Sequence, residues 1–363
     1  MRRGDTIVPP GSLPDREAAR AYCSAILPRV SRTFALNIRL LPGALGDAVL
    51  QAYLFCRMAD TVEDSPHLEA RHKPTLLQAY GELLPLCAGW EERVVGWSRP
   101  FAALAAVDPE HALCSRAPAV FVAFAALPAE LQSPVAACVR EMTAGMGEFA
   151  RRQAASPDGW LRLETIAELE EYCDYVAGTV GRMLCRLFAA STPRLDPERL
   201  ERMQRLAGRF GRAMQLTNII KDVADDNRRG ACYVPRSLAA RHRLRPEELL
   251  DPQRRAAARE VVRELAGLAV AALDSAVTFT LLIPRREPRL RLFCLWPIFL
   301  ALGTLRHVLD DERLFLPGAH LRIGRAEVRR CLGQTTLAVL SDRAIRRLYA
   351  RQRPALGACP VGY

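Results

Sequence analysis

The chain has 363 residues, of which half are apolar and a quarter are charged. This composition is that of a globular protein with a substantial core, and it excludes a chain disordered along its length. The formal net charge of +11 favours an anionic partner: nucleic acid, an anionic membrane surface or a phosphorylated substrate. The arginines are spread over the whole chain without aromatic interleaving, so we expect no nucleic-acid partner.

The eleven cysteines are scattered singly, in an odd number and without a Cys-x-x-Cys pair. This pattern is typical of reduced thiols and favours a cytoplasmic protein over a disulfide framework or a zinc site. The first residues contain no apolar stretch of the signal-peptide kind, and we interpret residues 1–17 as a mobile leader. The most apolar run, residues 292–305, is shorter than the roughly 20 residues of a membrane-spanning helix, which favours a buried helix.

Apolar residues recur at three- and four-residue spacing through most segments, and alternating strand patterns with Asn-Gly or Asp-Gly turns are absent. The sequence therefore predicts an all-α fold. Proline and glycine breaks cut the chain into about ten helices, and no break resembles a flexible linker. We expect one helical domain over residues 18–350, a bundle around a central apolar cavity, followed by a tail at residues 351–363.

The first segment that carries chemistry is residues 51–64, which lack glycine and proline and have the length of about four helical turns. The spacing places four polar side chains on one helix face, with Glu63 beside them: Tyr53, Arg57, Asp60 and Asp64. A solvent-facing ion pair is the simpler interpretation of an isolated Asp-x-x-x-Asp pattern. On an otherwise apolar helix, however, unpaired charge is expensive to bury, so something must compensate it.

A second acidic segment, residues 211–226, changes that interpretation. Its spacing places two amides and two carboxylates on one helix face: Gln215, Asn218, Asp222 and Asp226. Two such helices could face each other across a cavity and gather carboxylate oxygens, the ligands that Mg²⁺ prefers. Basic residues stand close to both segments in the sequence: Arg57, Lys221, Arg228 and Arg229. A substrate that is apolar at one end and polyanionic at the other fits this combination.

Four segments, in this order, resemble the squalene/phytoene synthase family over roughly residues 20 to 310. They are Val30–Ala35, Asp60–Asp64, Tyr172–Gly181, and Gln215–Asp226 with the Arg228-Arg-Gly and Tyr233-Val-Pro235 that follow it. A further segment, Phe293-Cys-Leu-Trp-Pro297, is similar to one in squalene synthases, and beyond Arg329 we find no resemblance.

The resemblance implies the isoprenoid synthase α-fold and a cluster of roughly three Mg²⁺ ions that bridges carboxylates to diphosphate. It also implies head-to-head condensation of two farnesyl diphosphates through a cyclopropylcarbinyl (presqualene) diphosphate. Squalene synthases quench the final cation with hydride from NADPH, without a Rossmann motif, whereas phytoene and dehydrosqualene synthases lose a proton. The form of the first acidic motif and the Phe293 segment favour squalene. The alternatives are a dehydrosqualene or phytoene synthase, a related terpene cyclase, and a non-catalytic helical scaffold.

Matched position by position, the resemblance assigns roles to individual residues. The metal ligands would be Asp60, Glu63, Asp64, Asp222 and Asp226. Diphosphate would be held by Ser31, Arg32, Arg57, Gln215, Asn218, Lys221 and Arg228. NADPH would contact Tyr53, Arg57, Asn218 and Phe293. Tyr172 would assist the proton loss that forms the cyclopropane, and Gly178 and Gly181 would admit substrate or a neighbouring helix at close range. Lys221 departs from the family's usual arginine and lacks its planar fork.

The expected partner is farnesyl diphosphate, and no pattern in the sequence specifies an oligomeric state. Because substrate and product are lipids and the surface is basic, we expect salt-sensitive peripheral association with anionic bilayers and no integral insertion. The predicted location is cytoplasmic, with peripheral attachment to the inner face of a membrane. No amphipathic helix with a concentrated basic face stands out in the sequence.

Overall fold

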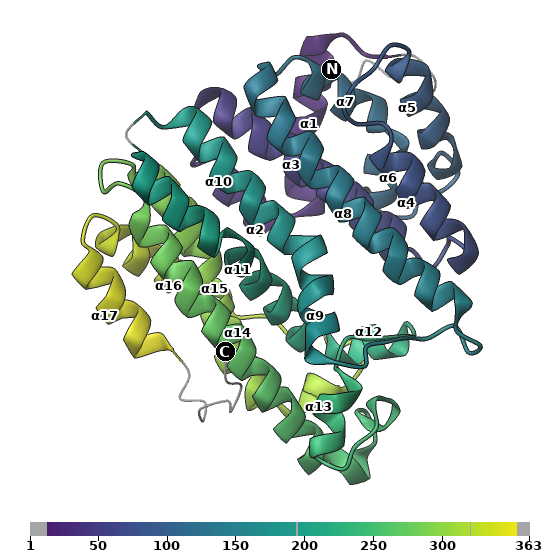
Figure 1. The fold of residues 1–363 in the computed structure, drawn as a ribbon, viewed down its shortest axis with the longest axis vertical. Helices are drawn as coiled ribbons and strands as arrows, with labels where there is room; N and C mark the ends of the chain where they lie inside the picture. The colour runs from purple at the N-terminus through teal and green to yellow at the C-terminus, as the bar shows by residue number, and fades with distance from the viewer. Residues whose placement is uncertain (1–12, 194, 320, 354–363) are drawn as a thin grey trace. The chain divides into compact units, whose positions relative to one another are not determined.

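The computed structural model describes residues 13–193, 195–319 and 321–353, and these residues are mainly helical, with almost no strand (Figure 1). The all-α prediction is confirmed. Within these ranges the chain forms seventeen α-helices instead of about ten, because several expected helices are divided by short turns. Five of these turns are 3₁₀ helices: Ala70–His72, Arg99–Phe101, Pro246–Glu248, Pro252–Arg254 and Glu312–Phe315. The only described strands, β1 (Leu161–Arg162) and β2 (Ala231–Cys232), pair in parallel.

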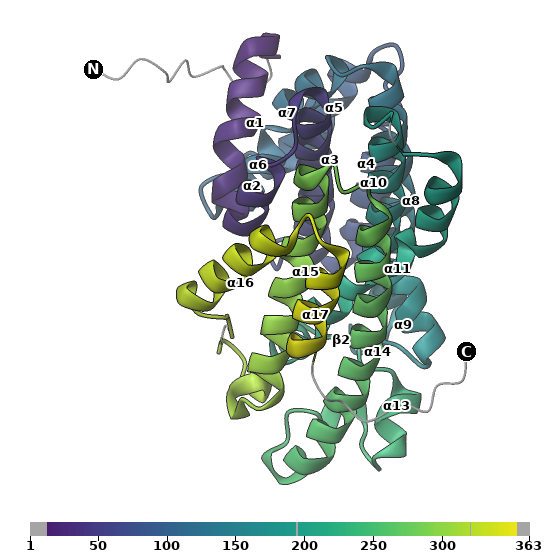
Figure 2. The ribbon, with the colours of Figure 1, turned by 90° about the vertical axis from the view of Figure 1, so that its left-hand side faces the viewer.

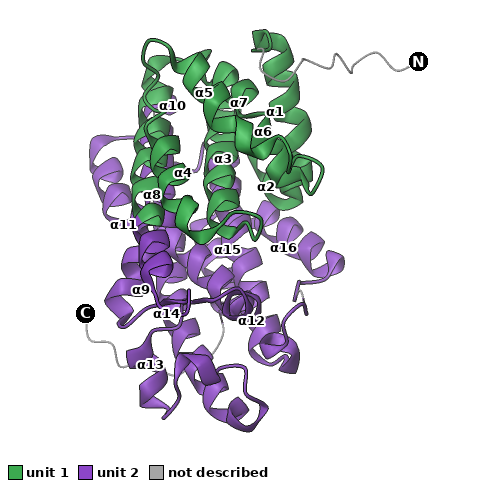
Figure 3. Ribbon diagram, turned by 90° about the vertical axis from the view of Figure 1, so that its right-hand side faces the viewer, with its two compact units in different colours: residues 1–147 green, residues 148–363 purple. Residues whose placement is uncertain are grey.

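The chain divides into two compact units, residues 1–147 and residues 148–363 (Figure 3). The boundary lies inside the long helix α8 (Ala129–Ala155), where no linker composition marks it. Residues 1–12 of the predicted leader and 354–363 of the predicted tail lie outside the described residues. The first described helix begins at Arg16 and the last one ends at Gln352. The predicted domain limits, 18 and 350, stay a prediction.

Unit 1 contains α1 (Arg16–Val30), α2 (Arg32–Ile38), α3 (Gly43–Asp64), α4 (Lys73–Gly81), α5 (Trp90–Ser98), α6 (Pro109–Ser115), α7 (Ala117–Ala125) and most of α8. Its core is aromatic: the Phe55 ring of α3 meets the edges of Phe121 and Phe124 at centroid distances of 4.8 and 5.1 Å. Since α3 buries its apolar faces in this core, its polar face is left for other partners.

Unit 2 contains α9 (Ile166–Cys173), a π-helical turn (Asp174–Gly178), α10 (Thr179–Ser191), α11 (Pro197–Lys221), α12 (Val223–Arg228), α13 (Arg236–Arg241), α14 (Arg255–Leu282), α15 (Pro288–Leu309), α16 (Arg325–Ala338) and α17 (Asp342–Gln352). Helices α11, α14 and α15 pack side by side (Figures 1 and 2). Glycines let the backbones approach: a Cβ on Gly181 would collide with the Ala207 carbonyl of α11, and one on Gly211 with the Ala177 carbonyl. The close partner expected at Gly181 is therefore a helix.

Two helical segments of unit 2 are long and apolar enough to cross a membrane by length and composition alone, Pro252–Leu282 and Pro288–Leu309. The mean hydropathies of their apolar windows are 1.8 and 1.7, and 61% of each window is buried inside the protein. The second segment contains the apolar run at residues 292–305. Core helices of a soluble bundle have these properties, and most of α14 and α15 packs against neighbouring helices.

Candidate active site

The first acidic motif occupies the polar face of α3, as the spacing predicts. Arg57 lies between two carboxylates: its Nη1 is 3.9 Å from Asp60 Oδ2, and its Nη2 donates to Glu110 Oε1 of α6 at 2.8 Å. Burial lowers the pKa of Arg57, but the charge of Asp60 and the hydrogen bond to Glu110 outweigh burial and raise it. Arg57 is thus a fixed cation beside the motif.

The carboxyl group of Asp60 is costly to ionise. Burial, the largest cause, and the charge of Asp64 one turn later raise its pKa to about 6, although Arg57 acts to lower it. The Asp60 side chain nevertheless keeps 39% of its surface exposed, so an ion can reach it. An accessible carboxylate that is costly to ionise beside a second carboxylate is the chemistry that a divalent, oxygen-seeking cation relieves, and the residues therefore fit Mg²⁺.

Helix α6 also holds the carboxyl end of α3 through a chain of three side chains, of which His111 and Ser65 are buried. Asp108, the N-cap of α6, accepts from the backbone N–H of His111 at 2.7 Å and lies 2.8 Å from His111 Nδ1. His111 Nε2 is 2.8 Å from Ser65 Oγ, and Ser65 follows Asp64 directly. The Asp108 carboxylate favours a proton on Nδ1, so that Nε2 accepts from the Ser65 hydroxyl. Sequence reasoning missed this chain.

The remaining predicted residues of unit 1 lie around the start of α2. The Ser31 hydroxyl caps this helix by accepting from the Phe34 N–H at 3.2 Å, and Arg32 is the exposed first residue of α2. The Tyr53 ring lies 5.1 Å from that of Phe34. Burial raises the pKa of Tyr53, and the Ser31 hydroxyl and Arg57 partly offset it. Ser31 and Tyr53 are therefore neighbours, although 22 positions separate them in the sequence.

The second acidic motif departs from prediction at one residue. Residues 211–226 were expected as one helix, but α11 ends at Lys221 and α12 begins at Val223, with Asp222 between them at φ −101° and ψ 11°. The backbone N–H of Asp222 still donates to Asn218 O at 2.8 Å, and that of Asp226 to Asp222 O at 2.9 Å. The four-residue spacing of the ladder therefore survives the break.

Each carboxylate of this motif has a cation beside it. Lys221 Nζ lies 2.8 Å from Asp222 Oδ2, Arg229 pairs with the buried Asp226, and Arg228 Nη2 is 3.3 Å from Asp225 Oδ1. Lys221 and Arg228, predicted to hold diphosphate, are thus engaged with acids here. Among the other ladder residues, Gln215 is half-buried and Asn218 is exposed.

Tyr172, on α9, lies in an aromatic stack that also contains Tyr233. Its hydroxyl donates to Tyr233 Oη at 3.0 Å, the two rings stack at 4.5 Å, and Phe149 meets Tyr172 edge-on at 5.1 Å. Both tyrosines are buried. The π-helical turn begins two residues after Tyr172, and such turns recur at functional sites.

Tyr233 is positioned by the segment that follows the second motif. Leu161 pairs with Ala231 in the short sheet, and its N–H donates to Gly230 O at 2.8 Å. Two residues beyond Tyr233, Pro235 is followed by Arg236, whose N–H donates to Leu163 O at 2.8 Å. Tyr233 was recognised in the sequence only as part of a motif, because nothing local indicates its partner 61 positions away.

Phe293, predicted to contact NADPH, is buried on α15 and packs edge-on against Phe188 at 6.1 Å. Of the other predicted dinucleotide contacts, Tyr53 and Arg57 belong to unit 1 and Asn218 to unit 2. Within the described ranges no three His, Cys, Asp or Glu side chains form a ready-made metal site.

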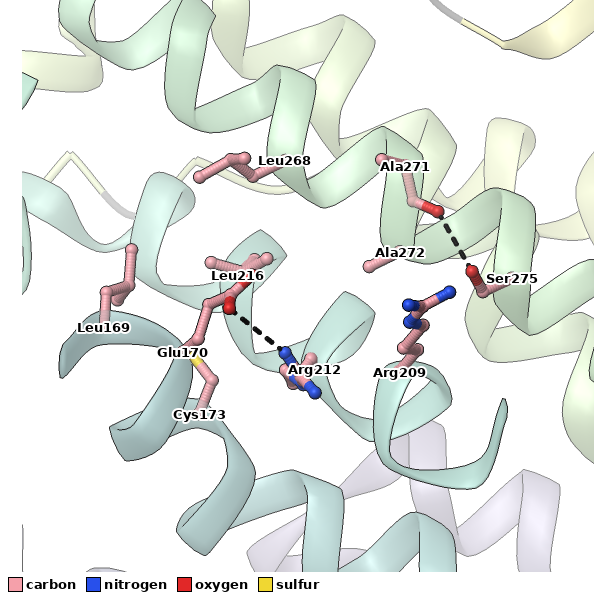
Figure 4. A pocket seen from close by; sticks show the side chains of 10 residues that line it. All are labelled: Leu169, Glu170, Cys173, Arg209, Arg212, Leu216, Leu268, Ala271, Ala272 and Ser275. Atoms are coloured by element: carbon pink, nitrogen blue, oxygen red, sulfur yellow. Dashed lines mark hydrogen bonds and ion pairs between the residues drawn. The ribbon is translucent and has the colours of Figure 1, made fainter. Parts of the chain in front are cut away.

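A separate cavity of about 360 Å³ lies between α9, α11 and α14 (Figure 4). Its lining combines polar side chains (Glu170, Arg209, Arg212 and Ser275) with Cys173, leucines and alanines. Arg212 Nη1 is 3.5 Å from Glu170 and its Nε 3.7 Å from Asp174, so this cation is already offset by acids. The cavity contains none of the predicted site residues.

The residues of these motifs also fall within the part of the chain that matches known proteins. The model of the squalene/phytoene synthase family matches residues 27–331. Squalene synthase BSS of Botryococcus braunii is 30% identical over 320 residues, which cover 87% of this chain and 64% of that protein. The chain thus spans less than two thirds of that relative's length. Squalene synthase of Homo sapiens is 27% identical, over 84% of this chain and 67% of its own.

Solved structures of similar proteins have the same overall fold. The complex of TcSQS with the ligand BPH1237 is 26% identical with a TM-score of 0.73, and the match covers 94% of both chains. A dehydrosqualene synthase with 23% identity shares the fold, with a TM-score of 0.60 over 90% of this chain and 98% of its own. The family model spans both acidic motifs, Tyr172 and Tyr233, and the chain belongs to the squalene/phytoene synthase family.

Proposed function

We propose that this chain joins two farnesyl diphosphates head to head, through presqualene diphosphate, and reduces the product to squalene with NADPH. The relatives named as squalene synthases support this choice. So does the retention of both acidic motifs, which a non-catalytic scaffold would not need. Dehydrosqualene or phytoene synthesis without reduction is the second candidate, since a dehydrosqualene synthase shares the fold.

The observation that carries the proposal is the buried hydrogen bond between Tyr172 and Tyr233. Two hydroxyl groups stacked among aromatic rings are costly to bury unless they are paired, and here the pair stands where water is excluded. A phenol beside a bound diphosphate can relay the proton that is lost when the cyclopropane closes, because its oxygen takes up that proton as its own passes on to the diphosphate. Tyr172 would be this relay, and Tyr233, which accepts its hydrogen bond, would orient it.

The acidic motifs and their cations would bind the diphosphates. Bound Mg²⁺ would neutralise the diphosphate leaving group, and Asp60, Glu63, Asp64, Asp222 and Asp226 are the residues that would hold it. Arg57 stays fixed by Glu110 and would add a permanent positive charge. Lys221 would exchange its ion pair with Asp222 for one with diphosphate. It would bind there as a point charge, because an ammonium group cannot make the two parallel hydrogen bonds of an arginine.

The test is incubation of the purified protein with farnesyl or geranylgeranyl diphosphate and Mg²⁺, followed by identification of the products. We expect turnover of farnesyl diphosphate, and loss of turnover in Asp60→Ala and Asp222→Ala while the helical circular dichroism is retained. Activity of both variants within about tenfold of the parent at saturating Mg²⁺ would refute the proposal.

We also propose that the chain works at a membrane surface, because its proposed substrate and product are lipids.

A further inference from the structure

The carboxy-terminal helices carry a concentration of positive charge that the whole-chain composition conceals. Residues 325–353, which form α16, α17 and their connection, contain eight arginines and two acidic residues. Their net charge of +6 is more than half of the chain's +11, although they are 29 of its 363 residues. A charge density of this kind attracts an anionic surface.

Both acidic residues of this segment are already paired. Asp342 receives Arg291 at 2.9 Å and Arg285 at 2.7 Å, and Glu327 receives Arg306 at 3.0 Å. Three arginines from outside the segment thus engage its two carboxylates, and within the segment Arg353 pairs with Asp274 of α14 at 3.0 Å. Six of the segment's own arginines are exposed and make no ion pair with any described residue: Arg325, Arg329, Arg343, Arg346, Arg347 and Arg351.

Four of these arginines share one face of α17. Arg343, Arg346, Arg347 and Arg351 are spaced by three, one and four residues, which places them together, while Ile345 and Tyr349 are buried on the opposite face. The buried face is well anchored, since Tyr349 Oη donates to Asp274 Oδ1 of α14 at 2.8 Å. The basic face is therefore a fixed feature of the folded unit.

Two leucines just before α17 are open to solvent. Leu337, in the last turn of α16, is 89% exposed, and Leu340, in the turn before α17, is 61% exposed. Figure 2 shows α16 and α17 joined by this turn and packed on α15. Single exposed leucines are common on protein surfaces. Two of them three residues apart, within the most basic segment of the chain, are typical of a surface that binds the interface of an anionic bilayer. Buried Arg291 holds the turn by donating to Val339 O at 3.1 Å.

We propose that α16 and α17 form a docking surface for an anionic lipid bilayer, with Leu337 and Leu340 inserted among the lipids and the α17 arginines on the headgroups. A second copy of the chain fits less well, because a two-fold contact would bring like charges together. Nucleic acid fits less well too, since leucines rather than aromatic rings or amides stand beside the arginines. The proposal is independent of which prenyl product the enzyme makes.

The experiment is sedimentation of the full chain with vesicles of phosphatidylcholine alone or with about 30% phosphatidylglycerol. We expect binding only to the anionic vesicles and its loss as salt is raised, since screening shortens the reach of the charges. The variant Arg343→Gln/Arg346→Gln/Arg347→Gln/Arg351→Gln should partition at least about a hundredfold more weakly, each arginine near the surface being worth roughly fivefold.

A matched control removes the same charge elsewhere in unit 2: Arg202→Gln/Arg236→Gln/Arg241→Gln/Arg263→Gln, all exposed and none assigned to the site. Leu337→Ser/Leu340→Ser is compared with Leu13→Ser/Leu316→Ser, two other exposed leucines. The proposal holds if only the α17 and Leu337/Leu340 variants lose binding while the melting temperature of every variant stays near the parent's. Equal loss in either control, equal binding to neutral vesicles, or a vesicle-free dimer that Leu337→Ser/Leu340→Ser dissociates would overturn it.

Discussion

The carboxyl group of Asp60 is accessible to an ion, although its negative charge is costly to form in the folded protein. Its pKa rises from the usual 3.8 to about 6, mainly by burial. Between these pH values the folded protein binds a proton that the unfolded chain releases, so stability falls as the pH rises through this window. Above pH 6 Asp60 is ionised in the folded protein, and the full free-energy cost of its buried charge is present. Without metal, we therefore expect Asp60→Asn to melt at a higher temperature than the parent at pH 7.5, with the difference closing near pH 4. Thermal unfolding in chelator measures it, and equal melting temperatures at pH 7.5 would count against this account.

The two stacked tyrosines should differ in their effect on turnover. Tyr172→Phe removes the proposed proton relay, and we expect formation of presqualene diphosphate to fall by about 100- to 10,000-fold, the usual effect of removing a positioned acid or base. Tyr233→Phe keeps the stack and removes only the partner hydroxyl, so a loss of about tenfold is expected. Single-turnover rates with farnesyl diphosphate measure both. If Tyr233→Phe is the more damaging change, the roles are reversed.

Residue roles could be inferred from the sequence where the evidence was local. Asp60 and Asp64 share a face of α3 because helical spacing requires it, and the structure has them there. Tyr233, His111 and Glu110 could not be found in this way, because their partners lie 61, 46 and 53 positions distant. A lone histidine after Asp-Pro-Glu is an ordinary helix start, and only tertiary packing joins it to Ser65.

At the scale of elements, α6 holds α3 at two points, Glu110 to Arg57 and His111 to Ser65. His111→Ala would leave the buried Ser65 hydroxyl and the Asp108 carboxylate without this partner. We expect a loss of about 1–3 kcal/mol in the free energy of unfolding, the usual cost of an unsatisfied buried polar group. Denaturant unfolding measures it, with the exposed His72→Ala as control. His111→Ala as stable as His72→Ala would mean that this chain of hydrogen bonds contributes nothing to the hold on α3.

Helix boundaries show what periodicity leaves out. Breaks at proline were predicted, for instance before α15 at Pro284, whereas the break at Asp222 has no glycine or proline to announce it. Asp222 leaves the helical conformation while its carboxylate pairs with Lys221, so a side-chain contact accompanies the break. No sequence signal marks the boundary between the two units inside α8 either, because a continuous helix has the same local pattern on both sides of it.

At the scale of the whole molecule, net charge indicated an anionic partner but not its place. The arginines occur along the whole chain, and most of those in the body pair with nearby acids, as Arg162 does with Asp158 and Glu247. Folding thus cancels charge in most of the structure and leaves it uncancelled on α17. Which cations stay unpaired depends on tertiary neighbours, and a sequence count cannot supply that.

The fate of the final cation is the property that separates the two candidate functions. After the second ionisation, the cation must be quenched by hydride, by proton loss or by water, and an apolar surround does not remove that requirement. If Tyr53, Arg57, Asn218 and the segment around Phe293 bind NADPH, hydride transfer should dominate whenever NADPH is present, and squalene should be the product. Without NADPH, presqualene diphosphate should accumulate or leak to dehydrosqualene and alcohols, because the first half-reaction needs only metal and substrate. The measurement is a pair of Mg²⁺ incubations with farnesyl diphosphate that differ only in NADPH. An identical product profile in both would assign the chain to the dehydrosqualene or phytoene branch, and the acidic motifs would keep the same role in either case.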